Sequence, residues 1–150
     1  WIRVNQPLYR YSNKITGIEL WFKNGRVVKA KAKTNEKLLK EMIATPGADK
    51  IGEYSLTDTR HSRITKFMAE TLFDENIGGP YGNSHIALGM SYRDTYAGDV
   101  SKLTDREAAR LGFNDSSVHT DVISPTRRTV TAYLSSGTSK IIYADGEFTF

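Results

Sequence analysis

The sequence contains no cysteine and only three histidines among its 150 residues. Thiolate zinc sites and disulfide frameworks are therefore excluded, and any metal must be bound by histidine, aspartate, glutamate or tyrosine. No apolar run approaches the roughly 20 residues that a membrane span requires, and no signal peptide is recognisable. We expect a cytoplasmic protein with no membrane contact.

The chain also lacks a strong excess of charge, with 21 basic and 17 acidic residues and a net charge of +4. The lysines of residues 29–40 fit the solvated surface of a hairpin and a helix better than a nucleic-acid interface, which needs a denser basic face. An RNA- or phosphate-binding domain that uses this stretch with Arg127 and Arg128 is the weaker alternative. No aromatic-interleaved basic motif or glycine-rich phosphate loop supports it.

Hydrophobic residues make up 39% of the chain, enough for one domain with a core. Alternating apolar residues around Asn24-Gly25 predict a hairpin over residues 18–32, because both turn residues tolerate a positive φ. A short strand is predicted over residues 51–56, and the part after residue 118 has the pattern of strands alone.

Apolar residues at helical spacing predict three helices, over residues 35–44, 62–72 and 104–112. Thr104 and Glu107 form a capping box at the start of the third helix. The predicted fold is a single mixed α/β (α+β) domain, in which about three helices pack against a largely antiparallel sheet.

His119 and Asp121 are the first pair of candidate metal ligands. They are two residues apart, so in a strand both side chains leave from the same face and can bind one ion. The alternative is a surface histidine beside a turn aspartate, and for this pair alone that alternative is favoured.

His85, Tyr92 and Glu53 extend the candidate set. His85 and Tyr92 are seven apart, which suits a strand that bends at Gly89, although a histidine before an apolar run is more often a core residue. Glu53 lies inside a predicted strand, where an inward carboxylate is costly unless it is paired or metal-bound. An outward glutamate on an edge strand is equally compatible with the pattern.

Asp74, Glu75 and Asn76 follow one another at the end of the second predicted helix. Negative charge is unfavourable at a helix C-terminus, so the triplet is a candidate for supporting contacts around a metal site. A turn in which Asn76 lies near the helix end explains the triplet almost as well.

The chain resembles the C-terminal part of the thermophilic metallopeptidases of the aminopeptidase T, aminopeptidase S and PepS type. The resemblance covers essentially the whole chain, and its motifs are jointly specific. The matching stretches are IGEYSL (51–56), TLFDEN (71–76), SHIALGMSY (84–92), LGFNDSSVHTD (111–121) and IIYADGEF (141–148).

The resemblance implies two divalent ions, zinc or cobalt, in a homodimeric enzyme that removes N-terminal residues from peptides. Carried over by motif, the metal ligands are Glu53, His85, Tyr92, His119 and Asp121. Glu53 is expected to bridge the ions, and Tyr92 to bind metal or donate to the developing oxyanion. Both are therefore candidate catalytic residues.

Two features depart from the family pattern. The loop between Asn76 and His85 is longer than in members with a three-residue link, and the family's further glutamate, in a Thr-Gly-Glu stretch, is absent together with an N-terminal α/β domain. We expect a C-terminal catalytic domain that binds metal weakly and has little peptidase activity alone. A non-catalytic dimerisation or binding module with an unused metal site is the main alternative.

Overall fold

The computed structural model describes residues 1–70 and 73–150, with the side chains of 71 and 72 outside the description. The first half contains β1 (Ile2–Arg3), β2 (Leu8–Arg10), β3 (Asn13–Ile15), β4 (Glu19–Lys23), β5 (Arg26–Lys31), α1 (Glu36–Ile43), β6 (Ile51–Thr57) and α2 (Thr71–Asp74). The second half contains β7 (Asn83–Gly89), η1 (Arg93–Thr95), η2 (Val100–Lys102), α3 (Asp105–Leu111), β8 (His119–Ser124), β9 (Thr129–Tyr133), β10 (Ser139–Ala144) and β11 (Glu147–Phe148).

The chain divides into two compact units, each made of two segments. Unit 1 contains Trp1–Tyr54 and Ile86–Val122, and unit 2 contains Ser55–His85 and Ile123–Phe150. The strands of the described residues form four small sheets, ordered β1-β4-β5, β2-β3, β6-β7-β8 and β11-β10-β9.

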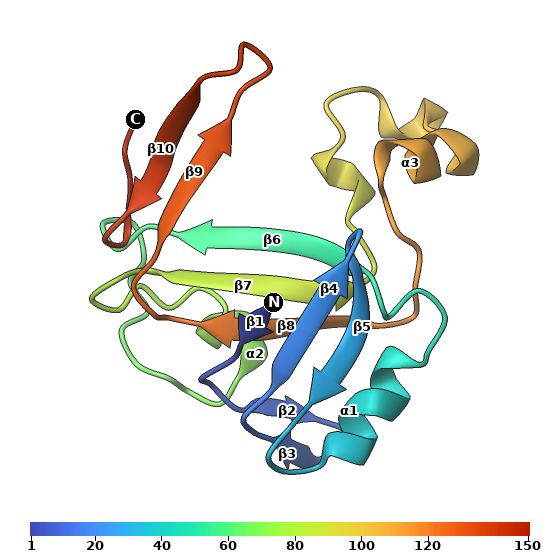
Figure 1. Ribbon diagram of the computed structural model, residues 1–150, viewed down its shortest axis with the longest axis vertical. Coiled ribbons are helices and arrows are strands. Elements are labelled where there is room, and N and C mark those ends of the chain that lie inside the picture. Colours follow the sequence, from blue (N-terminus) through green and yellow to red (C-terminus); the bar gives the residue numbers. More distant parts are fainter. The chain divides into compact units, whose positions relative to one another are not determined.

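The hairpin predicted in unit 1 is confirmed as β4 and β5, which run side by side in opposite directions (Figure 1). Asn24 and Gly25 connect them with φ values of 50° and 73°, as a tight turn between twisted strands requires. Apolar side chains from this hairpin and from α1 pack into a common core. Its buried members are Val4, Leu8, Ile15, Ile18, Leu20, Leu39, Met42, Ala48, Leu88, Val118 and Val122.

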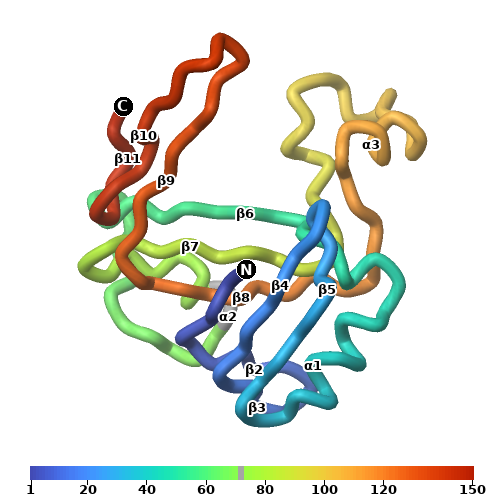
Figure 2. The backbone as a smooth tube through the Cα atoms, viewed as in Figure 1, coloured from blue at the N-terminus to red at the C-terminus, as the bar shows by residue number. Residues whose placement is uncertain are grey.

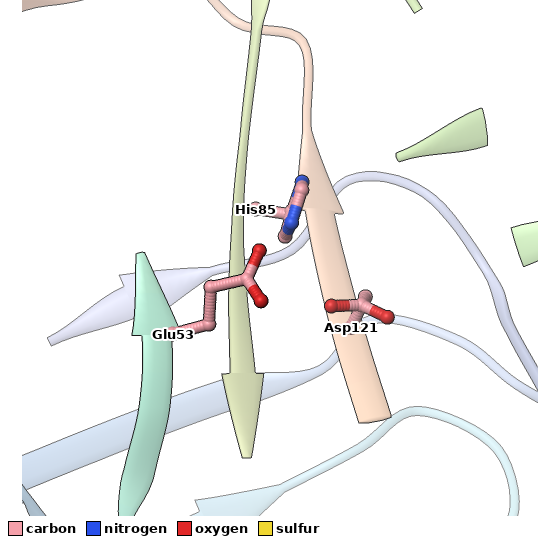
Figure 3. Close-up of side chains that lie close together, drawn as sticks. All are labelled: Glu53, His85 and Asp121. Atoms are coloured by element: carbon pink, nitrogen blue, oxygen red, sulfur yellow. The ribbon is translucent and has the colours of Figure 1, made fainter. Parts of the chain in front are cut away.

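In the sheet β6-β7-β8, neighbouring strands run in opposite directions (Figure 3). Gly52 lets β6 approach its neighbour closely, because a Cβ atom there would lie 2.4 Å from the carbonyl oxygens of Gly89 and Met90. The bend expected at Gly89 is present, since this residue has a φ of 104°. Its own Cβ atom would lie 1.9 Å from the carbonyl oxygen of Val118.

Helix α3 lies in the long connection between β7 and β8, which is coloured from yellow-green to orange in Figure 2. The predicted capping box is confirmed, with the Thr104 hydroxyl accepting from the Glu107 N–H and the Glu107 carboxylate accepting from the Thr104 N–H. At the other end, Gly112 has a φ of 98°. The N–H groups of Gly112 and Phe113 donate to the carbonyls of Ala109 and Ala108, which is a Schellman motif.

The helix predicted over residues 62–72 is wrong for residues 62–70, which are irregular, and only the short α2 follows. Phe67 and Met68 are 36% and 51% exposed, so their helical spacing does not mark a buried face. The segment is held instead by the buried carboxylate of Asp74, which accepts from the N–H groups of Met68 at 2.6 Å and Glu70 at 2.9 Å. The predicted helix also included Thr71 and Leu72, whose side chains the structure does not describe.

The predicted C-terminal strands are confirmed in unit 2, where β9, β10 and β11 form an antiparallel sheet. Asp145 and Gly146, with φ values of 51° and 90°, form the turn between β10 and β11. Tyr143 is buried and donates to the Thr57 carbonyl at 2.8 Å. This bond ties the C-terminal sheet to the end of β6.

The mixed α/β class with antiparallel pairing is confirmed, but the number of helices is not. Of the three expected helices, two are present in the described residues, α1 and α3, apart from the four-residue α2. Among the described residues, no helix is long and apolar enough to cross a membrane.

Candidate metal centre

Three neighbouring strands contribute the centre of the candidate site. Glu53 on β6, His85 on β7 and Asp121 on β8 each direct one ligand atom toward the others (Figure 3), and these atoms all lie within 4.8 Å of one another. His85 and Asp121 are buried, while the side chain of Glu53 is about one-third exposed at 32%. Residues far apart in the sequence are therefore close in space because their strands are neighbours.

His119 lies against the same two carboxylates. Its Nε2 atom is 3.8 Å from Glu53 Oε2 and 3.6 Å from Asp121 Oδ1. As predicted from their spacing, His119 and Asp121 leave the same strand on one face. The site thus combines two imidazoles with two carboxylates.

Backbone carbonyls orient both imidazoles. Nδ1 of His119 lies 2.8 Å from the carbonyl oxygen of Met90, and Nδ1 of His85 lies 3.1 Å from that of Glu75. A carbonyl oxygen can only accept, so each Nδ1 is the donor, and in the neutral imidazole the lone pair is then on Nε2. This is the tautomer that a metal-binding histidine requires, with its other nitrogen held by an outer contact.

Asn83 positions the carbonyl that holds His85. Its fully buried side-chain amide donates to the carbonyl oxygens of Asp74 at 3.2 Å and Glu75 at 2.8 Å. Asn83 was not among the candidates from the sequence, and neither was the Met90 carbonyl. The sequence did not reveal the Met90 contact because a backbone carbonyl is present in every residue type. It did not reveal Asn83 because an asparagine in a turn-rich stretch is typical of a loop.

Members of the triplet proposed for supporting contacts use both side-chain and backbone groups. The Asp74 carboxylate holds the preceding segment, and the Glu75 contact with His85 comes from the carbonyl oxygen. The carbonyl oxygen of Asn76 accepts from the Ser62 hydroxyl at 2.5 Å.

Tyr92 lies beside His119. Its ring centroid is 4.7 Å from that of His119, and the residue is 46% exposed. It immediately precedes η1, and its carbonyl oxygen accepts from the Thr95 hydroxyl at 2.7 Å. All five predicted ligands therefore lie close together, and Tyr92 contacts this group through the ring of His119.

Asn114 and Ser116 anchor the loop that leads into β8. The Asn114 amide donates to the carbonyls of Gly47 at 2.8 Å and Gly89 at 2.6 Å, and the Ser116 hydroxyl donates to that of Pro46 at 2.8 Å. These bonds fix the start of the strand that carries His119.

A cavity of about 350 Å³ opens beside Glu53. Its wall comes entirely from unit 1 and includes the end of α3. The lining residues are Gly52, Glu53, Tyr54, Ser91, Tyr92, Thr95, Leu111, Gly112 and Phe113.

The donor set suits a divalent ion. Two ligands that each lie about 2.1 Å from one ion are at most about 4.2 Å apart. The limit of 4.8 Å among Glu53, His85 and Asp121 therefore requires only small side-chain movements. Imidazole nitrogen and carboxylate oxygen are ligands of zinc and similar ions, so the residues present fit a metal.

Carboxylates and oriented imidazoles on neighbouring strands beside an open cavity are an arrangement that metal-dependent hydrolases use. The chain belongs to the thermophilic metalloprotease (M29) family, which matches residues 1–148. Membership in this family implies a divalent metal.

Similar proteins include aminopeptidases from three bacteria. The chain is 30% identical to aminopeptidase AmpS of Bacillus subtilis, with 97% of this chain and 35% of the relative covered. It is 34% identical to aminopeptidase PepS of Streptococcus thermophilus (82% and 29% covered) and 32% identical to aminopeptidase 2 of Geobacillus stearothermophilus (99% and 36% covered).

The fold is similar to that of wild-type AmpT from Thermus thermophilus. The TM-score is 0.83 at 26% identity, with 99% of this chain and 36% of the solved chain covered. The chain thus spans about a third of the length of the relatives it matches.

Proposed function

We propose that this chain forms the metal-binding catalytic domain of an aminopeptidase that hydrolyses N-terminal residues from peptides. The observation that carries the proposal is the approach of Glu53, His85 and Asp121 within 4.8 Å, in a chain of a metalloprotease family. The aminopeptidase names of the relatives support the choice of substrate.

We also propose two ions rather than one, as the family resemblance implies. Glu53 and Asp121 each lie near both imidazoles, so either carboxylate has an oxygen for each of two positions. Glu53 would be the residue that holds both ions, because it also lines the open cavity. Two negative side chains reduce the repulsion between two cations.

A divalent ion bound here supplies Lewis acidity to the scissile carbonyl. The chain's own residues orient the reactants: the Met90 and Glu75 carbonyls hold the imidazoles, and the cavity beside Glu53 receives the peptide. Tyr92, with its half-exposed ring against His119, is placed to bind metal or to donate a hydrogen bond to the oxyanion.

We further propose that the active enzyme contains more than these residues, since the relatives are about three times as long. The family resemblance places a further ligand glutamate in that additional part. Zinc or cobalt as the ion, a homodimer as the assembly and the cytoplasm as the location remain predictions from the same resemblance.

A cobalt titration followed by visible absorption tests the metal centre. Replacing a ligand should weaken binding by more than the roughly 10- to 100-fold typical of losing an outer contact, so His85→Ala and His119→Ala should each exceed that loss. His61→Ala is the matched control, because His61 is the third histidine and lies outside the cluster. Parent-like affinity in both variants, or an empty site in an anomalous-scattering map after metal soaking, would favour the non-catalytic binding module.

A further inference from the structure

The cavity beside Glu53 is lined by apolar, aromatic and polar residues and by one acidic residue. Leu111 and Phe113 contribute apolar side chains, and Tyr54 and Tyr92 contribute aromatic rings, while Glu53 alone carries a charge. The lining contains no lysine, arginine or histidine in the part of the chain that the structure describes. An acidic side chain entering this space would lose water without gaining an opposite charge, which is unfavourable. A basic side chain would meet only Glu53, whose carboxylate the proposed function assigns to the metal.

Large apolar side chains are left uncovered around this cavity. Tyr54, Tyr92 and Leu111 are 52%, 46% and 51% exposed, although they cluster at one opening. An apolar surface that stays open beside a reactive centre gains free energy when a ligand covers it. The space of about 350 Å³ is near the lower end of the range for ligand pockets, so it suits a single side chain.

The end of α3 holds the apolar wall in place. The Schellman motif at Gly112 fixes the backbone between Leu111 and Phe113, because both N–H groups at this end are bonded to helix carbonyls. On the other side, Gly52 places Glu53 against β7. The apolar wall and the proposed metal ligand are therefore parts of one preformed cavity in unit 1.

We propose that this cavity binds the side chain of the substrate's N-terminal residue and selects uncharged, mainly apolar side chains, with Leu111 and Phe113 determining the specificity. The inference rests on the proposed function, since it assumes that the substrate's N-terminal residue is bound beside Glu53 when it is cleaved off. The scissile carbonyl belongs to the N-terminal residue, so when that carbonyl lies at the metal centre beside Glu53, the side chain of the same residue lies next to the cavity.

Binding of amino-acid amides to the 150-residue chain tests this selectivity. We would record amide NMR spectra with and without zinc while adding leucinamide, glycinamide, aspartic acid α-amide or lysinamide. Leucinamide should bind at least about 10-fold more tightly than the other three and shift the signals of Ser91, Thr95, Gly112 and Phe113. Equal dissociation constants for leucinamide and glycinamide would overturn the proposal.

Leu111→Gln and Leu134→Gln form a matched pair, because both leucines are 51% exposed and only Leu111 lines the cavity. Leu111→Gln should remove most of the preference for leucinamide, whereas Leu134→Gln should keep it. Zinc affinity should be unchanged in both variants. Loss of the preference in both variants, or in neither, would contradict the assignment of Leu111.

The two proposals can fail separately. If zinc binds but leucinamide has no advantage, the specificity assignment is wrong and the metal centre stands. If zinc does not bind but leucinamide still shifts the cavity residues selectively, the cavity assignment stands and the metal-binding role proposed for Glu53, His85 and Asp121 in this chain is wrong.

Discussion

At the scale of single residues, Gly52 determines where the carboxylate of Glu53 lies. The backbone of the neighbouring strand is so close to Gly52 that a Cβ atom would lie 2.4 Å from two carbonyl oxygens. No rotamer change can relieve that contact, because both partners are backbone. A glycine before the proposed ligand is therefore a steric requirement for placing it.

Gly52→Ala should destabilise the fold by about 3 kcal/mol, near the upper end for overpacking, and weaken cobalt binding through Glu53. Urea unfolding and the cobalt titration measure the two effects. Gly137→Ala is the control: its Cβ atom would meet nothing within 4 Å, so only the positive φ of 81° opposes it. Equal losses in the two variants would mean that the close approach at Gly52 has little effect.

Asp58 in unit 2 makes stability depend on pH. The buried carboxylate accepts from the Arg60 guanidinium and from the N–H groups of Phe148 at 2.8 Å and Arg60 at 2.9 Å. The Arg60 hydrogen bonds are the largest cause that holds the pKa of Asp58 well below its ordinary value. Because the folded pKa is lower than the unfolded value of about 3.9, this stabilisation is complete above that pH and is lost as the pH falls toward the folded pKa.

Asp58→Asn should lower the free energy of unfolding at pH 7 by about 1–3 kcal/mol, since charge-assisted hydrogen bonds are lost. The difference from the parent should shrink as the pH is lowered below about 4. Urea unfolding at a series of pH values measures it. Glu41→Gln, which removes an exposed pair with Lys37 at 3.7 Å, should change stability little at any pH. A pH-independent cost for Asp58→Asn would argue against the carboxylate as its source.

At the scale of elements, α3 is a short helix determined by its two ends. Seven residues are too few for an isolated helix to be stable in water, and among them only Ala108 is buried. The capping box at Thr104 and the Schellman motif at Gly112 therefore replace the packing that longer helices use. The position of the cavity wall depends on these caps.

Thr104→Ala should destabilise α3 by about 1 kcal/mol, the usual cost of losing an N-cap side chain, and should increase hydrogen exchange from Ala108 to Phe113. Thr104→Ser keeps the hydroxyl and should restore the parent behaviour. If Thr104→Ser exchanges as fast as Thr104→Ala, the methyl group and not the cap is responsible.

At the scale of the whole molecule, the chain contains the candidate metal centre. It spans only about a third of the length of its relatives. We predict that the 150-residue chain folds cooperatively, binds zinc or cobalt weakly and shows little or no hydrolysis of an aminoacyl chromogenic substrate. Calorimetry and a chromogenic assay measure these properties. Two tight sites and rapid turnover would show that the additional part is not needed.

The sequence by itself determined the local elements and predicted the candidate ligand residues. Asn24-Gly25 predicted the hairpin and Thr104 with Glu107 predicted the helix start, because turn and cap geometry depend on adjacent residues. It failed at residues 62–70, where apolar spacing indicated a helix but the Asp74 carboxylate holds irregular backbone. A hydrogen bond of this kind leaves no periodic signal.

Only the tertiary structure decided which residues meet. Strand order brings Glu53, His85 and Asp121 together, and neither their chemistry nor their spacing specifies which strands are neighbours. The Met90 carbonyl that orients His119 and the apolar wall at Leu111 are equally invisible in the sequence. The physical reason is that adjacent residues determine turns and caps, whereas a binding site depends on packing between segments far apart in the chain.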